Sequence, residues 1–352
     1  MRIAITGATG NVGTALLRRL TTSQEHELVG LARRLPEGDD GGVEWVAVDL
    51  TGGDDSVLRE AFRGADAVVH LAWGFQPSHD TEYLARLGVG GTRRVLVAAT
   101  ATGVPHLVHM SSVGAYSPGP AVEPVDESWP TEGVAGSPYS RHKVRAERLL
   151  DAYERDDGPV TITRLRPGLI GQRGAAGALL RYAVPGFVPA RALGLLPAIP
   201  LDRRLRVPMV HADDVAAAIE LALRRRLGGA FNLAAEPPVT AVTIADALGA
   251  RCVHVPASVL RRAASLAWRV RLQQVDPGWL DLAMQVPLLD TTRARNELGW
   301  APEVPADAVL RETVAGLVRA EATGTPVLRP RTASGRLADL VRRGPVGNRR
   351  TP

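Results

Sequence analysis

The sequence predicts an α/β protein built on a doubly wound parallel sheet, with a smaller C-terminal substrate lobe. Short apolar runs alternate with stretches of helical spacing through the first half of the chain, which is typical of βαβ units. The first run ends in a glycine-rich turn that leads directly into a helical stretch. The length of 352 residues suits two domains, or one large domain with an attached lobe.

The predicted strands are nearly continuous in apolar residues, which indicates a parallel sheet buried on both faces. They are expected at Arg2–Thr6, His26–Ala32, Glu44–Val48, Ala67–Leu71, His106–Met110 and Val160–Leu165. Between the first two, Val12, Leu16 and Leu20 recur at helical spacing. This order of elements predicts a sheet of the Rossmann type with helices on both faces.

The domain boundaries are placed where this alternation breaks. After residue 171 the chain is rich in Gly, Ala, Pro and Leu without clear periodicity. The expected parts are a Rossmann domain at 1–171 completed by 207–235, a substrate-binding lobe at 172–206 and 236–323, and a flexible arginine-rich tail at 324–352.

Four further elements are expected beyond residue 206. Val207–His211 and Asp213–Arg224 are predicted to return to the main sheet as a strand and a helix. Further helices are predicted at Ser258–Arg269 and Ala306–Ala320.

Composition limits the possible partners and the compartment. The formal net charge is +5, but residues 324–352 carry seven arginines and one acid, so the rest of the chain is close to neutral. We therefore expect no nucleic-acid partner, and no apolar stretch is long enough for a membrane span. No signal peptide precedes the first strand, and the single cysteine, Cys252, cannot form an intramolecular disulfide, which favours the cytoplasm.

The glycine-rich turn predicts a dinucleotide site. It reads Gly7-Ala8-Thr9-Gly10-Asn11-Val12-Gly13, with glycines at G-x-x-G-x-x-G spacing. Glycines permit a tight turn and let backbone N–H groups approach a pyrophosphate at the positive end of a helix. Thr9, Gly10, Asn11 and Val12 are therefore expected to contact the cofactor together with Gly7 and Gly13.

Two more positions bear on the cofactor. The second predicted strand ends in Arg33-Arg34 rather than an acid. An acid would hold a free ribose 2′-hydroxyl, whereas arginine suits a 2′-phosphate, so the site is expected to bind NAD(P) and to favour NADP over NAD. Asp49-Leu50 follows the third strand and is placed to meet the adenine.

A tyrosine and the only lysine of the chain predict a catalytic pair. Of 42 lysine and arginine residues, only Lys143 is a lysine, and it follows Tyr139 by four positions, on one face of a helix that Ser137 and Pro138 begin. A nearby ammonium lowers the pKa of a phenol, and it can also donate to ribose hydroxyls. Ser112 follows the fifth predicted strand, where it can hold a substrate oxygen.

These residues resemble the extended short-chain dehydrogenase/reductases of the NAD-dependent epimerase/dehydratase family. The resemblance covers about residues 1–320 and includes Gly7–Gly13, Asp49-Leu50, His70-Leu71-Ala72, Ser112, Tyr139 with Lys143, Arg166-Pro167-Gly168, His211–Ala216 and Glu297–Trp300. It implies that Ser112 binds the substrate oxygen, that Tyr139 is the acid–base, and that Lys143 orients the nicotinamide ribose. It also implies that Leu71, Ala72 and Pro167 line the nicotinamide site.

The chain departs from the family pattern at two places. The asparagine of the family motif Asn-x-x-Gly-Thr is Gly88 here, which puts a proton relay through that side chain in doubt. The Asp-Glu pair of the dehydratase branch is replaced by Val113 and Gly114, so 4,6-dehydration of a sugar nucleotide is not expected.

The substrate stays open between alternatives. The leading hypothesis is oxidoreduction or epimerisation at a secondary alcohol or ketone carbon of a sugar nucleotide, with a diphosphate clamped by arginines such as Arg173, Arg203, Arg204 and Arg206. Trp73, Phe75 and the apolar segment 175–200 favour an NADPH-dependent reductase of an apolar ketone or aldehyde instead. A non-catalytic NADP-sensing regulator is the alternative from another class, and Tyr139 with Lys143 argues against it.

Two further expectations concern metal and assembly. His106 and His109 lie on a predicted buried strand without Cys or acid ligands at useful spacing, so no metal site is expected. His142 is expected to be exposed on the catalytic helix. The family resemblance implies a homodimer through helices at about 80–102 and 138–154.

Overall fold

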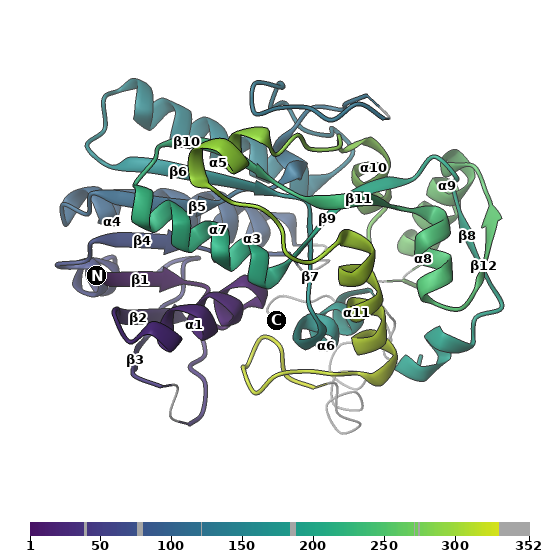
Figure 1. The fold of residues 1–352 in the computed structure, drawn as a ribbon, viewed down its shortest axis with the longest axis horizontal. Helices are drawn as coiled ribbons and strands as arrows, with labels where there is room; N and C mark the ends of the chain where they lie inside the picture. The colour runs from purple at the N-terminus through teal and green to yellow at the C-terminus, as the bar shows by residue number, and fades with distance from the viewer. Residues whose placement is uncertain are drawn as a thin grey trace.

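Parallel β-strands form the central layer of the protein, in a computed structural model that describes residues 1–38, 41–75, 80–120, 122–183, 188–270, 272–273 and 275–330. The strand order is β10-β6-β5-β4-β1-β2-β3, and every pair is parallel. The strands are β1 Arg2–Thr6, β2 Glu27–Ala32, β3 Val43–Ala47, β4 Ala67–His70, β5 His106–Met110, β6 Thr161–Pro167 and β10 Gly229–Leu233. This sheet confirms the predicted Rossmann-type fold (Figure 1).

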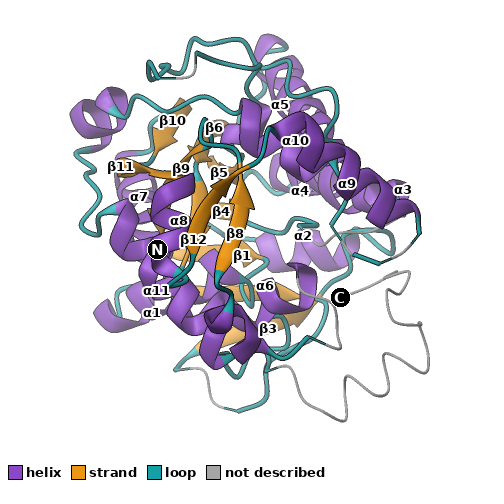
Figure 2. Ribbon diagram, turned by 90° about the vertical axis from the view of Figure 1, so that its right-hand side faces the viewer, coloured by secondary structure: helices purple, strands orange, loops and turns teal. Residues whose placement is uncertain are grey.

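Helices cover both faces of the sheet. The core on one face packs under α1 Asn11–Ser23 and α7 Ala212–Arg225, and the core on the other packs under α2 Ser56–Phe62, α4 Gly91–Ala101 and α5 Pro138–Arg155. Figure 2 shows the sheet between these two layers. The stripe predicted at Val12, Leu16 and Leu20 is buried on α1. A parallel sheet buried on both faces explains why its strands are apolar throughout.

The smaller lobe is built from short sheets and helices. β7 Leu169–Gly171, β9 Arg206–His211 and β11 Ala235–Thr240 form one sheet, and β8 Ala198–Leu201 pairs with β12 Arg251–His254. Its helices are α6 Ala176–Ala183, α8 Ala241–Ala247, α9 Ala257–Arg269, α10 Gly278–Gln285 and α11 Ala306–Arg319. In the larger domain, α3 Thr81–Ala85 continues into α4 through a π-helical turn, Arg86–Gly90, on the face of the sheet that α4 and α5 cover.

One predicted strand belongs to a different sheet. Val207–His211 was expected to rejoin the main sheet, but β9 pairs with β7 and β11, and β10 is the added strand of the main sheet. An apolar run shows that a strand is buried but not which neighbour it pairs with, because either sheet can bury it. The predicted helix after it, α7, does pack on the main sheet against α1.

The beginning of the predicted tail is packed rather than flexible. Residues 324–330 follow α11, and Leu328 within them is only 1% exposed. Leu328 lies in an apolar cluster with Ala175 and Ala178. The rest of the predicted tail, residues 331–352, lies outside the described residues.

Among the helices in the described ranges, none is both long enough and apolar enough to cross a bilayer.

Candidate active site

The glycine loop between β1 and α1 is closely packed against the residues that follow β4, the strand beside β1 in the sheet. Gly7 has φ +74°, and a Cβ at this position would lie 2.7 Å from the backbone N of Ala72. A Cβ at Gly13 would lie 2.5 Å from the carbonyl oxygens of Gly7 and Ala8. Only glycine fits either position, so the loop brings its backbone N–H groups close to the N-terminus of α1.

A cavity of about 130 Å³ opens in front of this loop, and we call it the glycine-loop cavity. It is lined by residues from the carboxyl ends of β1, β2 and β4: Thr6, Gly7, Thr9, Gly10, Leu31, Ala32, Arg33, Arg34, Val48, Leu50, Leu71, Ala72 and Trp73, together with Leu87 and Val327. Most cofactor residues predicted from the sequence are among them. The glycine cradle, the apolar walls and the arginines at one end fit an NAD(P) dinucleotide.

The other predicted cofactor residues lie near this cavity but not on its described wall. Asn11, Val12 and Gly13 form the first turn of α1, and the side-chain amide of Gln172 donates to the carbonyl oxygen of Asn11 at 2.6 Å. Asp49 accepts hydrogen bonds from the backbone N and the hydroxyl of Thr51, so it stabilises its own turn. Pro167 ends β6. Their contact with a cofactor therefore stays a prediction.

The predicted catalytic residues come together on α5. The hydroxyl of Ser137 caps the helix by accepting from the backbone N of Ser140 at 3.3 Å. Tyr139 and Lys143 then lie on successive turns. The Ser112 side chain lies beside Tyr139, and its hydroxyl accepts from the backbone N of Gly114 at 3.0 Å. Burial raises the pKa of Tyr139 to about 12, and the Ser112 side chain opposes that rise.

Gly114 leaves the space that the Tyr139 ring needs. A Cβ at position 114 would lie 3.0 Å from Cε1 of Tyr139 and 3.4 Å from Oγ of Ser112. A larger acidic side chain, as in the dehydratase branch, would require this neighbourhood to shift. The departure noted in the sequence therefore has a packing reason as well as a chemical one.

Lys143 is buried against an aromatic ring. Its Nζ donates to the carbonyl oxygen of Met110 at 2.8 Å and lies 3.5 Å from the ring centroid of Trp73. Burial lowers the pKa of Lys143 to about 7, and the Glu147 carboxylate opposes this shift. A cation over an indole face is stabilised by the ring quadrupole, so Trp73 supports the charged form of Lys143.

Gly88 makes room for Trp73. A Cβ at Gly88 would lie 2.9 Å from two atoms of the Trp73 indole. The asparagine usual at this position in the family would therefore compete with the indole for the same space. The sequence showed the loss of a polar side chain, and the structure shows what occupies its place.

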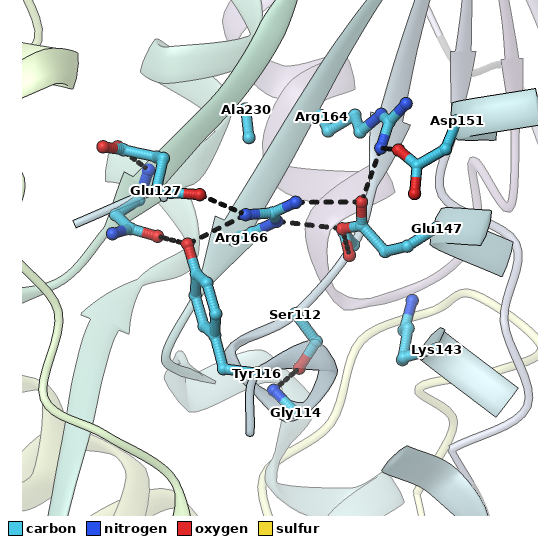
Figure 3. Close-up of polar contacts among 12 residues, drawn as sticks. Ser112, Gly114, Tyr116, Glu127, Lys143, Glu147, Asp151, Arg164, Arg166 and Ala230 are labelled. Atoms are coloured by element: carbon cyan, nitrogen blue, oxygen red, sulfur yellow. Dashed lines mark hydrogen bonds and ion pairs between the residues drawn. The ribbon is translucent and has the colours of Figure 1, made fainter. Parts of the chain in front are cut away.

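Glu147 lies one further turn along α5, and Figure 3 shows the network around it. Arg166 donates to both of its carboxylate oxygens, from Nε at 2.9 Å and from Nη2 at 3.0 Å. Arg164 donates at 2.9 Å and the Ser111 hydroxyl at 2.5 Å. Burial raises the pKa of Glu147, but Arg166, Arg164 and Ser111 together lower it to about 2. The carboxylate therefore stays charged although it is buried.

The network continues away from α5 to the added strand of the sheet. Arg166 also donates to the Tyr116 hydroxyl at 3.0 Å, and that hydroxyl donates to Oδ1 of Asn232 on β10 at 2.7 Å. Sequence reasoning missed this network. The signal was present: two arginines two residues apart in an apolar strand, Arg164 and Arg166, require buried acid partners.

A second cavity of about 320 Å³ lies beside Tyr139, and we call it the aromatic cavity. Tyr139, Trp268 and Trp279 contribute to its wall. The Trp279 ring centroid lies 5.0 Å from that of Tyr139 and 4.7 Å from that of Phe75. Trp73, the predicted substrate residue, packs edge-on against Tyr139 at 6.4 Å. Tyr139 thus lines the aromatic cavity, and its neighbour Trp73 lines the glycine-loop cavity.

The arginines predicted to clamp a diphosphate do not line either described cavity. Arg173 forms an ion pair with Glu321 at 3.4 Å, and its backbone N donates to Glu312. Arg204 forms an ion pair with Asp202 at 2.8 Å. The cation on the wall of the aromatic cavity is Arg261, which pairs with Asp281 at 2.7 Å. The sequence could not distinguish these pairs, because the acid partners of Arg173 and Arg261 are distant in the chain.

Among the histidines, one expectation was wrong. His142 was expected to be exposed, but it is 8% exposed and lines the aromatic cavity, because α3, α9 and α10 cover this side of α5. Burial and the charges of Arg145 and Arg141 lower its pKa to about 4, so it is neutral at physiological pH. Within the described part of the chain, no group of three or more His, Cys, Asp or Glu residues could hold a metal ion.

Comparisons with known proteins agree with this geometry. A model of the NAD dependent epimerase/dehydratase family matches residues 3–234. The dTDP-6-deoxy-L-talose 4-dehydrogenase (NAD(P)(+)) of Kitasatospora kifunensis is 30% identical over 92% of this chain and 96% of its own length. The crystal structure of Thermus thermophilus UDP-glucose 4-epimerase in complex with NAD has a TM-score of 0.65 at 24% identity, covering 90% of this chain and 99% of that one.

The chain therefore belongs to the NAD-dependent epimerase/dehydratase family of NAD(P)-dependent enzymes. An uncharacterized protein of Mycobacterium tuberculosis is 31% identical over 89% of this chain, and the match spans only 29% of that longer protein. The family model assigns the class of the protein, and the residues of its own site bear on the substrate.

Replacing Glu147 with Gln is expected to destabilise the fold by about 3–5 kcal/mol, because two buried guanidinium groups lose their shared countercharge. The wild-type carboxylate has a folded pKa of about 2, below the unfolded value of about 4.3. Its contribution is present above pH 4.3 and is lost as the pH falls toward 2. Urea unfolding from pH 7 to pH 3 measures this, with exposed Glu132→Gln as the control. A wild-type and a Glu147→Gln protein of equal stability would contradict it.

The single lysine allows its pKa to be measured directly. With lysine labelled at Cε with ¹³C, one side-chain signal is expected to titrate near pH 7 in the folded, cofactor-free protein, because burial disfavours the ammonium. The same signal in concentrated urea should titrate near the ordinary value of about 10.4. A midpoint near 10 in the folded protein would contradict the buried position of Lys143.

Proposed function

We propose that this protein is an NADP-favouring oxidoreductase that acts at a secondary alcohol or ketone carbon. The observation that carries the proposal is the grouping of Tyr139, Ser112 and the buried Lys143 beside both cavities. Tyr139 lines the aromatic cavity, and Trp73, which packs against Tyr139 and Lys143, lines the glycine-loop cavity. This arrangement gives a proton donor and a second hydroxyl at one point, next to a cradle for a dinucleotide.

The roles follow from what each side chain can do there. Ser112 and Tyr139 bind the substrate oxygen, and Tyr139 passes the proton to or from it. Lys143 holds a positive charge beneath them and orients the nicotinamide ribose. When bound, the nicotinamide supplies or accepts the hydride. Because burial keeps the pKa of Tyr139 near 12, the phenol is protonated at neutral pH, which suits reduction of a carbonyl.

Arg33 and Arg34 support the preference for NADP. Both lie on the wall of the glycine-loop cavity at the end of β2, where an acid would favour the free 2′-hydroxyl of NAD. Arg33 donates to the Tyr83 hydroxyl at 2.5 Å, and this contact fixes its side chain at the cavity.

Two substrate classes compete, and the cavity favours the less polar one. The printed activity of the Kitasatospora relative favours a sugar nucleotide. A diphosphate needs unpaired cations, whereas Arg261 on the aromatic cavity is paired with Asp281. Trp268 and Trp279 instead offer broad apolar faces beside Tyr139, so we propose an apolar ketone or aldehyde as the substrate.

The proposed dimer is opposed by surface charge. Arg93 on α4 and Arg141, Arg145 and Arg148 on α5 are exposed. A twofold contact through these helices would bring like charges together. The homodimer through about 80–102 and 138–154 stays a proposal on the family resemblance alone.

Tyr139→Phe is expected to reduce kcat by at least about a hundredfold, because the variant removes the proton that this step needs. The Kd for NADPH should change by less than about twofold, since the ring and its packing remain. Stopped-flow turnover and fluorescence titration measure the two quantities. Unchanged turnover would contradict the role of Tyr139.

A substrate panel separates the two classes. With NADPH, an aryl ketone such as acetophenone is expected to be reduced to the alcohol, while UDP-glucose and a dTDP-hexose supplied with NADP⁺ or NAD⁺ should be neither oxidised nor epimerised. Trp279→Ala should raise the KM for the aryl ketone with little change in the KM for NADPH, because it removes one wall of the aromatic cavity. Activity with the sugar nucleotides alone would reverse the substrate assignment.

A further inference from the structure

The ten residues that follow α11, 321–330, return to the N-terminal domain, and we call them the strap. In Figure 1 this yellow segment passes α6 on its way toward α1. The backbone N of Gly177 donates to the carbonyl oxygen of Glu321 at 2.8 Å, and the Arg181 guanidinium donates to the carbonyl oxygens of Val327 and Arg329. The strap is therefore attached to α6 near both of its ends.

Small residues allow the strap to approach this closely. A Cβ at Gly177 would lie 3.2 Å from the carbonyl oxygens of Glu321 and Arg329, and one at Gly174 would lie 2.7 Å from the Thr323 side chain. Leu328 is buried in the same contact. The path of the strap is thus set by packing as well as by hydrogen bonds.

The middle of the strap contacts the glycine loop itself. The Thr325 hydroxyl donates to the carbonyl oxygen of Thr9 at 2.9 Å. Val327 lies on the wall of the glycine-loop cavity, opposite residues from β1 and β2. The strap is therefore part of the wall that would enclose a bound dinucleotide.

The strap also adds positive charge at one end of the cavity. Burial lowers the pKa of Arg34, and the charges of Arg329 and Arg33 lower it further, so each of these two guanidinium groups lies close enough to repel that of Arg34. Within the described ranges, none of the three forms an ion pair with a carboxylate. Clustered cations with no acid to neutralise them are the arrangement that a phosphate group would stabilise.

We propose that the strap closes the adenosine end of the dinucleotide site and that Arg329 binds the 2′-phosphate of NADP together with Arg34. This rests on the proposed preference for NADP and adds a specificity-determining residue from the far end of the chain. It also gives a function to the first part of the segment that the sequence predicts as a flexible tail.

The test compares binding of NADP⁺, NAD⁺, adenosine 2′,5′-bisphosphate and AMP by isothermal titration calorimetry. Arg329→Ala is expected to weaken NADP⁺ and the bisphosphate about tenfold, the order expected for one charge-assisted contact, and to leave NAD⁺ and AMP within twofold. Arg251→Ala, an exposed arginine on β12, is the matched control. A chain that ends at Pro330 should bind all four ligands like the full chain.

Thr325→Val tests the strap separately from the charge. It removes the bond to Thr9 and should weaken NADP⁺ and NAD⁺ to the same extent. If Arg329→Ala weakens NAD⁺ as much as NADP⁺, the assignment to the 2′-phosphate is wrong. If Arg329→Ala and Thr325→Val both leave all four ligands unchanged, the strap proposal fails.

The proposed preference for NADP can fail independently. A wild-type protein that binds NAD⁺ more tightly than NADP⁺ would overturn the preference and the role of Arg329. An effect of Thr325→Val on NAD⁺ binding would in that case still support a strap that encloses the cofactor.

Discussion

The buried ion pair between Glu147 and Arg166 holds α5, the helix that carries Tyr139 and Lys143, on the sheet. Tyr139, Lys143 and Glu147 occupy successive turns on one face of α5, so fixing the third residue fixes the height and rotation of the other two. A carboxylate that is 1% exposed at its side chain is tolerable only because Arg164, Arg166 and Ser111 satisfy both of its oxygens. The position of the Tyr139 phenol thus depends on the ion pair of Glu147, two helical turns away.

The same balance of burial and charge sets the protonation of the site. Among the described residues no carboxylate forms an ion pair with the Lys143 ammonium, which donates to the Met110 carbonyl oxygen and lies over the Trp73 ring. With a pKa of about 7, the charged and neutral forms of Lys143 are about equally stable at neutral pH, while Tyr139 stays protonated. A dinucleotide with its phosphates would favour the charged lysine, so cofactor binding and the charge state of the site are coupled.

The sequence predicted the parts of this protein that depend on local rules. Glycine spacing, strand alternation and the four-residue separation of Tyr139 and Lys143 are all readable along the chain. Contacts between distant segments were not predictable, because no short pattern encodes them. Trp73 fills the space above Gly88, Arg166 finds Glu147, and β9 pairs with β7 rather than with the main sheet. No short pattern shows that residues 324–330 pack against α6, which is why the sequence predicts a flexible tail there.

The contact between Thr325 and Thr9 also bears on how the molecule is assembled during synthesis. The glycine loop leaves the ribosome long before Val327, which forms part of the wall of the same cavity. The main sheet likewise lacks an edge until β10 has emerged. A nascent chain therefore carries an incomplete glycine-loop cavity until residue 327 has been synthesised, and domains generally fold in the order in which they are made. With the strap closing the site as we propose, tight binding of a cofactor requires a chain that has been synthesised past residue 327.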